Sequence, residues 1–356
     1  MSRFLSDKLK SLEAYVPGEQ PRDKKYIKLN TNESPYPPSE HTVNTINRIE
    51  VENLKLYSDP TCKVLKEKIA QQFGFESENV YVGNGSDECL NFFFMAFCDK
   101  NKKVAFPDVT YGFYNVFAQL YGLDYQEIPL KNDFSVNVND YIGINKNIVI
   151  ANPNAPTGMA LSLDNIERIV QTNKDYIVVI DEAYVDFGGQ SALSLVNKYD
   201  NLLVVRTFSK SYSLAGARLG FAIGHKDIIA ELEMIKYSTN PYNINRLSQI
   251  AGISAMESND YYMDNCKKII ETREYTKFEL EKLGFNVLNS KANFLFARHS
   301  ALSGEKIYSE LKNKGILVRH FTKEKIKDFN RITIGSEEEM RIFIKILSEI
   351  VKGEEL

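Results

Sequence analysis

Short apolar runs alternate with helical segments through the middle of the chain, and this alternation constrains the fold more than any other feature. The helical segments include the deeply apolar stretch Leu90–Phe97 and the amphipathic stretch Leu163–Gln171. The runs predicted as strands are Val80–Val82, Val104–Phe106, Tyr125–Ile128, Ile148–Ala151, Ile177–Ile180, Leu202–Val205 and Phe221–Ile223. Strands separated by helices favour a mostly parallel sheet flanked by helices, so we predict an α/β fold for this part of the chain.

The two ends of the chain differ from this middle. Residues 1–40 are rich in proline and lack apolar periodicity, which is typical of an extended arm. The segments predicted after about residue 245 are a charged amphipathic helix at 261–283, strands at 294–297, 316–318 and 331–334, and helices at 304–314 and from 336 onward. We therefore predict an arm and the start of a small domain over residues 1–40, a large domain over 41–245 and a small α+β domain over 246–356.

The composition excludes several classes of protein. Hydrophobic residues make up 43% and charged residues 26% of the 356, which is ordinary for a soluble globular protein. A net charge of −3 gives no electrostatic basis for binding nucleic acid or an anionic membrane. The N-terminus lacks the apolar core of a signal peptide and no run could span a membrane, so we expect a cytoplasmic protein. The four cysteines and four histidines are scattered, so we expect reduced thiols and no metal site.

Polar sequences follow three of the predicted strands directly. They are NPNAPTG at 152–158, DEAY at 181–184, and Arg206 with Lys210. Ligands of open α/β sheets bind beyond the carboxyl ends of the strands, so these segments are expected to meet at one pocket. Each has an ordinary explanation by itself: a proline turn, a helix cap or a solvated lysine. Their occurrence together favours the pocket.

The sequence GSDE at 85–88 precedes the apolar helix and has two interpretations. Free backbone N–H groups and the helix dipole favour a phosphate at such a helix start. The same residues also suit a simple N-cap, with acidic side chains complementing the dipole. Ser209 and Arg218 offer further anion ligands, which makes the two interpretations equally favoured.

These motifs together resemble the signature of the fold-type I aminotransferases, which use pyridoxal 5′-phosphate (PLP). The resemblance covers essentially the whole chain and implies an aspartate aminotransferase-like fold. Within that superfamily, other segments resemble the histidinol-phosphate aminotransferases. They are YVPG at 15–18, NESP at 32–35, Tyr57, GSDE at 85–88, RTFSK at 206–210 and RITIG at 331–335.

The resemblance implies catalytic roles for three residues. Lys210 forms the Schiff base with the cofactor and then moves the proton between substrate and cofactor. Asp181 pairs with the pyridine nitrogen, whose positive charge makes the ring an electron sink. Tyr184 binds the cofactor's phenolic oxygen. We expect positive neighbours such as Arg206 or Arg218 to lower the pKa of Lys210, since its amine must be partly neutral to react.

Further residues bind the cofactor by the same resemblance. Tyr111 stacks on the ring, and Ser209, Arg218 and the backbone amides of Ser86 and Asp87 hold the phosphate. Arginine suits this task because its guanidinium binds phosphate bidentately. Packing in a core or an interface is the alternative role for each tyrosine.

The resemblance also implies a homodimer with shared active sites. Tyr57 reaches the phosphate of the cofactor in the neighbouring subunit, and it also belongs to the substrate site of that subunit.

The substrate must be bound through its anionic groups. Arg331 and Arg319 match the substrate-binding arginines of the family, and Tyr15 on the arm closes over the same group. An exposed surface arginine is an equally weighted alternative for Arg319. Two arginines with tyrosines suit a dianionic phosphate, because charge-assisted contacts increase with available charge. This favours transfer of the amino group from L-histidinol phosphate to 2-oxoglutarate, giving imidazole acetol phosphate and glutamate in histidine biosynthesis.

Three other functions share parts of this pattern. An aromatic amino-acid aminotransferase and a phosphothreonine decarboxylase of the same fold could use the same framework. A non-catalytic PLP-fold binding protein is a third class. The intact Lys210, Asp181 and Arg218, without an appended DNA-binding domain, argue against that third class.

One position departs from the family pattern. Many aminotransferases have asparagine where Ala155 stands, and that asparagine donates to the phenolic oxygen of the cofactor. Asn154, which we assign to the cofactor site, or Asn152 could supply the donor through a shifted loop. Otherwise the donor is absent and the phenolate is less stabilised.

Overall fold

The computed structural model describes residue 9 and residues 12–353 of the chain. Within these residues the strands form one sheet of seven strands and one of five. The larger sheet holds β2 (Val80–Asn84), β3 (Val104–Pro107), β4 (Tyr125–Ile128), β5 (Asn147–Ala151), β6 (Val178–Asp181), β7 (Leu202–Thr207) and β8 (Leu219–Gly224). The smaller sheet holds β1 (Ile27–Leu29), β9 (Phe285–Val287), β10 (Phe294–His299), β11 (Ile316–His320) and β12 (Asn330–Thr333).

The larger sheet has the order β2-β8-β7-β6-β5-β3-β4 and is mostly parallel. Neighbouring strands from β7 to β4 are parallel, and β8 runs against both β7 and β2. The strands β5, β6 and β7 are buried along their whole length. This burial explains their continuous apolar sequences and confirms the predicted α/β architecture.

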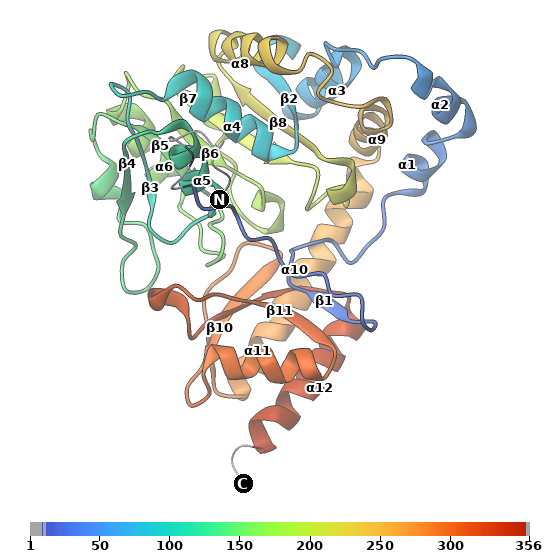
Figure 1. Ribbon diagram of the computed structural model, residues 1–356, viewed down its shortest axis with the longest axis vertical. Helices are drawn as coiled ribbons and strands as arrows, with labels where there is room; N and C mark the ends of the chain where they lie inside the picture. Colours follow the sequence, from blue (N-terminus) through green and yellow to red (C-terminus); the bar gives the residue numbers. More distant parts are fainter. Residues whose placement is uncertain (1–8, 10–11, 354–356) are drawn as a thin grey trace.

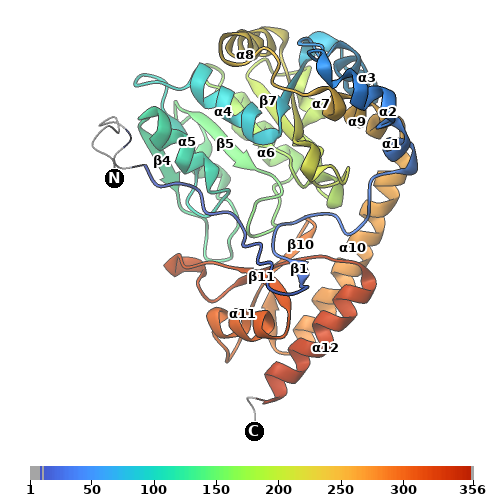
Figure 2. The same cartoon turned by 45° about the vertical axis from the view of Figure 1, so that its right-hand side comes forward.

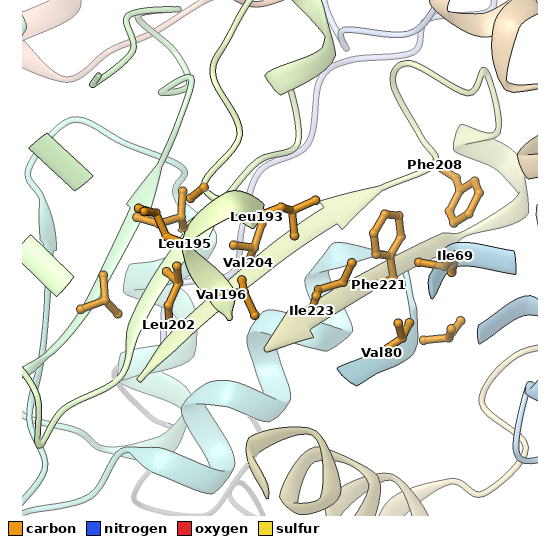
Figure 3. Packing of buried hydrophobic residues seen from close by; sticks show 14 of the residues in the cluster. Ile69, Val80, Leu193, Leu195, Val196, Leu202, Val204, Phe208, Phe221 and Ile223 are labelled. Atoms are coloured by element: carbon orange, nitrogen blue, oxygen red, sulfur yellow. The ribbon is translucent and has the colours of Figure 1, made fainter. Parts of the chain in front are cut away.

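Helices cover both faces of this sheet (Figure 1). One face packs against α4 (Ser86–Phe97), α5 (Phe113–Tyr121) and α8 (Lys226–Thr239). The other packs against α3 (Lys63–Phe73), α6 (Leu163–Thr172), α7 (Leu193–Val196) and α9 (Arg246–Glu257). Strand side chains alternate between these two cores: Val204 faces the second, with Phe221 and Ile223 beside it (Figure 3), whereas Val205 faces the first.

The smaller sheet has the order β1-β11-β12-β10-β9 and forms the core of a second domain. The end of the arm enters this sheet as β1, which pairs in parallel with β11. The helices beside it are α10 (Asn259–Lys282), α11 (Gly304–Asn313) and α12 (Glu337–Gly353). Figure 2 shows α10 running from the large domain down alongside α12, so this long helix connects the two parts.

Some elements were not expected from the sequence. The three-residue strands β1 and β9 are too short to carry a period, and only pairing with β11 and β10 defines them. The helix α9 packs against α1 (Glu40–Thr45) and α3 of the large domain. The division at residue 245 stays a prediction, and this packing favours a boundary within α10. In the part of the chain that the structure describes, no helix has the length and apolar character needed to cross a membrane.

Candidate active site

A cavity of about 990 Å³ lies at the carboxyl ends of β5, β6 and β7, between the large domain, the small domain and the arm. Its volume is in the range of small-molecule sites. Most of the site residues predicted from the sequence line it: Tyr15, Ser86, Asp87, Tyr111, Asp181, Tyr184, Ser209, Lys210, Arg218, Arg319 and Arg331. The structure thus brings together side chains from both domains and the arm.

Lys210 follows the end of β7 and holds its amine inside the cavity. The Nζ atom donates to the carbonyl oxygen of Thr31 at 3.1 Å and lies 5.9 Å from the ring centroid of Tyr184. Burial lowers the pKa of Lys210 to about 8, and the positive charge of Arg331 contributes to the same shift. The neutral, nucleophilic form of the amine is therefore far more populated near physiological pH than in an ordinary lysine, although the protonated form still predominates.

Asp181 ends β6 and lies buried on the floor of the cavity. Its carboxylate accepts from the hydroxyl of Tyr114 at 2.7 Å and from the N–H of Ala183 at 3.2 Å. Burial raises the pKa of Asp181 to about 6, although these two hydrogen bonds favour the charged form. A cationic nitrogen placed against the carboxylate would stabilise that form further.

The start of α4 lines the cavity together with Arg218. Its N-cap residue, Gly85, has no side chain, and Glu88 accepts from the backbone N–H of Asn84 at 2.7 Å, so both the cap and the phosphate interpretation remain open. Asp87 accepts from the hydroxyl of Tyr111 at 2.8 Å and from Arg218 at 3.0 Å. A Cβ added at Gly85 would lie 2.6 Å from Nη2 of Arg218, so glycine permits this close approach of guanidinium and backbone.

Two arginines of the small domain also line the cavity. Arg331 on β12 donates to the carbonyl oxygen of Asn30 at 3.1 Å, and its buried Nε has no partner among the described residues. Arg319 on β11 donates to the carbonyl oxygens of Val16 and Pro17 on the arm, at 2.8 and 3.0 Å. An unpartnered buried donor favours an anionic ligand beside Arg331.

The arm also places an aromatic wall over the cavity. Tyr15 stacks on Phe113 with ring centroids 4.3 Å apart and meets Tyr111 edge-on at 6.1 Å. Tyr15 is still 37% exposed, so it lies at the mouth of the cavity rather than in its interior.

Two asparagines considered at the sequence level are not among the described residues that line the cavity. The side-chain amide of Asn154 donates to the carbonyl oxygen of Val109 and to the hydroxyl of Thr157, and it accepts from the hydroxyl of Thr110. The Asn152 side chain bonds the backbone of Leu161. Neither asparagine is among the described residues that line the cavity, whereas Ala155 is. Both amides are hydrogen-bonded to neighbouring protein groups, so the assignment of Asn154 or Asn152 as the replacement donor stays a prediction.

Arg206 does not act on Lys210 as expected. It is buried on the other face of the sheet, where it pairs with Asp186 and lies near Glu182. Residues of β7 alternate in direction, which separates it from the cavity.

Tyr57 lies outside the cavity and is 80% exposed, stacked on Tyr242 with centroids 4.4 Å apart. Its assignment to the site of a neighbouring subunit stays a prediction.

The site also contains residues that the sequence did not single out. Tyr114 lies within the apolar sequence of α5, which gave no sign of a role in the site. Only the structure shows that its buried hydroxyl donates to Asp181. Asn30 and Thr31 contact the site through their carbonyl oxygens. Asn32 belongs to the NESP motif quoted from the sequence, but the sequence assigned it no role, and its side chain contacts Tyr184.

Comparison with known proteins identifies the family. The model described as aminotransferase class I and II matches residues 24–347. A histidinol-phosphate aminotransferase of Brachyspira hyodysenteriae is 54% identical over 99% of this chain and 100% of its own length. One of Clostridium beijerinckii is 48% identical over 99% of each chain. The chain belongs to the histidinol-phosphate aminotransferase family.

Solved structures share the fold of this family member. The histidinol-phosphate aminotransferase of Sinorhizobium meliloti, in complex with pyridoxal-5′-phosphate, matches with a TM-score of 0.88 at 22% identity over 99% of each chain. The aspartate aminotransferase of Thermus thermophilus with maleate matches with a TM-score of 0.79 at 19% identity over 92% of each chain. These likenesses confirm the aspartate aminotransferase-like fold.

Proposed function

We propose that the protein is a PLP-dependent aminotransferase that transfers the amino group of L-histidinol phosphate to 2-oxoglutarate in histidine biosynthesis. Membership of the histidinol-phosphate aminotransferase family supports this assignment. The observation that carries it is the cavity itself, which unites a buried lysine of lowered pKa, a buried carboxylate and anion-binding groups. A cytoplasmic location remains part of the proposal.

The donor set of the cavity fits PLP. The α4 N-terminus, Ser209 and Arg218 suit its phosphate, Asp181 suits a protonated ring nitrogen, and Lys210 suits its aldehyde. When bound, PLP supplies an aldehyde that condenses with amines and a ring that accepts electron density. The unpartnered Nε of Arg331 remains available for an acidic group of the substrate.

The chain's own residues perform binding and proton transfer. Asp181 holds a proton on the ring nitrogen, since its carboxylate is buried and already oriented by Tyr114. Lys210 acts as the general base and acid, because a neutral amine with a pKa near 8 both accepts and returns a proton near neutral pH. The arm and Tyr15 cover the cavity and exclude water from it.

Two arginines at the substrate end favour a doubly charged group. Arg319 and Arg331 lie on neighbouring antiparallel strands and are directly opposite each other in the register of β11 and β12. Each guanidinium adds charge-assisted hydrogen bonds to an anion, so a phosphate gains more from the pair than a carboxylate does.

Half-reaction spectroscopy with a panel of amino donors tests this substrate assignment. Among histidinol phosphate, phosphothreonine, phenylalanine and aspartate, histidinol phosphate is expected to convert the bound cofactor to its amino form fastest. An Arg331→Gln variant is expected to lose about 10- to 100-fold in kcat/KM for histidinol phosphate, which is the loss of one charged hydrogen-bonding group. The matched control is Arg298→Gln, because Arg298 lies on the adjacent β10 outside the cavity lining and contacts Phe329. Carbon dioxide release from phosphothreonine, or fastest conversion by phenylalanine, contradicts the assignment.

A homodimer with shared sites is part of the proposal. Many large apolar side chains in residues 43–64, which include Tyr57, are exposed, and Tyr242 stacks on Tyr57, which supports a subunit contact there. The side chains of this surface are Val43, Ile46, Ile49, Val51, Leu54, Leu56, Tyr57, Val64 and Tyr242. A second copy covering this surface would bury these side chains and bring Tyr57 to the neighbouring cavity.

A substitution of Tyr57 distinguishes a dimer whose subunits share active sites from a dimer with two independent sites. Tyr57→Phe is expected to weaken PLP binding about tenfold while leaving the sedimentation mass of the dimer unchanged, because it removes one hydrogen bond to a charged group. Tyr237→Phe serves as the control, since Tyr237 is a half-exposed tyrosine on α8. Mixed dimers of Tyr57→Phe and Lys210→Ala subunits should regain one site of normal affinity. A monomeric wild type, or mixed dimers without such a site, refutes sharing.

A further inference from the structure

Asn32 is buried beside the cavity, and its backbone adopts a left-handed conformation. It is 1% exposed and has a φ of 54°, in the left-handed region where asparagine is tolerated better than most residues. Its carbonyl oxygen accepts from Nδ2 of Asn293 at 3.1 Å. The residue is therefore held from both its backbone and its side chain.

The hydrogen bonds of Thr333 on β12 determine which way the Asn32 amide faces. The N–H of Asn32 donates to Oγ1 of Thr333 at 3.0 Å, so this hydroxyl is already an acceptor. Its single proton is then donated to Oδ1 of Asn32, which lies 2.9 Å away. Because Oδ1 is paired with Thr333, Nδ2 is the atom that faces Tyr184, and it donates to the Tyr184 hydroxyl at 3.0 Å.

This contact decides the role of the Tyr184 hydroxyl. A phenol carries one proton, and here its oxygen accepts from Asn32, so the proton remains available for an acceptor inside the cavity. Donation into the phenol oxygen also makes that proton a stronger donor through cooperativity. Tyr184 lines the cavity beside Lys210.

Among the described residues of the loop at 152–158, the two that line the cavity, Ala155 and Pro156, carry no side-chain amide. Ala155 contributes only a methyl group, and the Asn152 and Asn154 amides are bound elsewhere. The adjoining carbonyl groups of Asn30 and Thr31 accept from Arg331 and Lys210. The segment that carries Asn32 is thus already tied to the reactive end of the site.

We infer that Asn32 is a positioning residue for Tyr184. Its amide, oriented by Thr333, makes the Tyr184 hydroxyl the proton donor to the phenolic oxygen of the cofactor. This hydrogen bond compensates for the alanine at position 155. The inference rests on the proposed PLP-dependent function. In this inference, Asn32 of the arm stabilises the phenolate of the cofactor through Tyr184, a role that Ala155 in the loop at 152–158 does not perform.

A pH titration of the visible absorption of the PLP-loaded enzyme tests this role. Asn32→Gly removes the side-chain amide but keeps a residue that readily adopts positive φ. It is expected to raise the pH midpoint of the change in visible absorption by about one unit, which corresponds to losing part of one charged hydrogen bond. Asn32→Asp tolerates the same backbone conformation and offers Tyr184 an acceptor. It is expected to raise the midpoint at least as much, because the hydroxyl proton turns away from the cavity.

A double-variant cycle separates positioning from packing. Tyr184→Phe alone is expected to raise the midpoint, and adding Asn32→Gly to Tyr184→Phe is expected to add nothing, since Asn32 acts through the hydroxyl. Thr333→Val, which keeps Asn32 but frees its amide, provides a second route if Asn32→Gly does not fold, and its midpoint is expected to rise as well.

The outcomes distinguish this role from the proposed function. An unchanged midpoint in Asn32→Gly or Thr333→Val, or a shift that persists in the Tyr184→Phe background, overturns the inference while leaving the aminotransferase assignment intact. Failure of the wild type to take up PLP at Lys210 overturns the proposed function itself.

Discussion

Replacing Lys210 with alanine is expected to lower kcat/KM for transamination by about 10⁴-fold or more, because one side chain supplies both the nucleophilic amine and the proton transfer. The amine lies in the cavity, bonded only to the carbonyl oxygen of Thr31 among the described residues, and burial with the Arg331 charge lowers its pKa to about 8. Steady-state kinetics with histidinol phosphate and 2-oxoglutarate measure the loss.

Controls for Lys210 test the chemistry rather than the fold. Lys210→Arg keeps a positive charge but cannot condense with an aldehyde, so it is expected to be as inactive as Lys210→Ala. Lys198→Ala removes an exposed lysine paired with Glu167 and is expected to retain wild-type kinetics. Borohydride reduction of the wild type followed by peptide mapping should find the pyridoxyl group on Lys210. Its appearance on another lysine refutes the assignment.

Replacing Asp181 with asparagine is expected to lower kcat by about 10²- to 10³-fold, the usual effect of removing one preorganised electrostatic group. An amide cannot hold the proton on the ring nitrogen as a carboxylate does, so the ring accepts electron density less well. The matched control is Glu182→Gln. Glu182 is the next residue and equally buried, but it faces Ser191 and Arg206 outside the cavity lining. A kcat loss as large in Glu182→Gln as in Asp181→Asn contradicts the role.

The buried carboxyl of Asp181 is also expected to make the folding stability of the cofactor-free protein depend on pH, and Asp181→Asn is expected to remove this dependence. Burial raises the pKa of Asp181 from 3.8 to about 6, so the folded state binds the proton more tightly than the unfolded state. Below pH 3.8 the carboxyl is protonated in both states, so the folding stability does not change with pH. As the pH rises from 3.8 through 6, the stability falls by about 3 kcal/mol in total. Between pH 5 and 8 the wild type should lose about 1.4 kcal/mol relative to Asp181→Asn. Denaturant titrations at both pH values measure this, and equal losses in both proteins refute it.

The predictions that held depended on local sequence. The continuous apolar runs identify β5, β6 and β7 because a central parallel strand is buried on both faces, and their polar ends mark the site because parallel strands end at one edge. The assignment of Asn154 stays a prediction, because the direction of its side-chain amide is set by Val109 and Thr157 around it and not by the motif. A motif indicates which residues are near a site but not which way each amide faces.

What the sequence by itself determined was the alternating α/β architecture, the position of Lys210, Asp181 and Arg218 at strand or helix ends, and the family resemblance. Only the tertiary structure decided that Asn32 contacts Tyr184, 152 residues away, and that Arg319 holds the arm through Val16. The physical reason is the range of the interactions. Strand and helix patterns reflect neighbours a few residues apart, whereas the environment of each catalytic group depends on how the arm and the small domain pack against the edge of the large sheet.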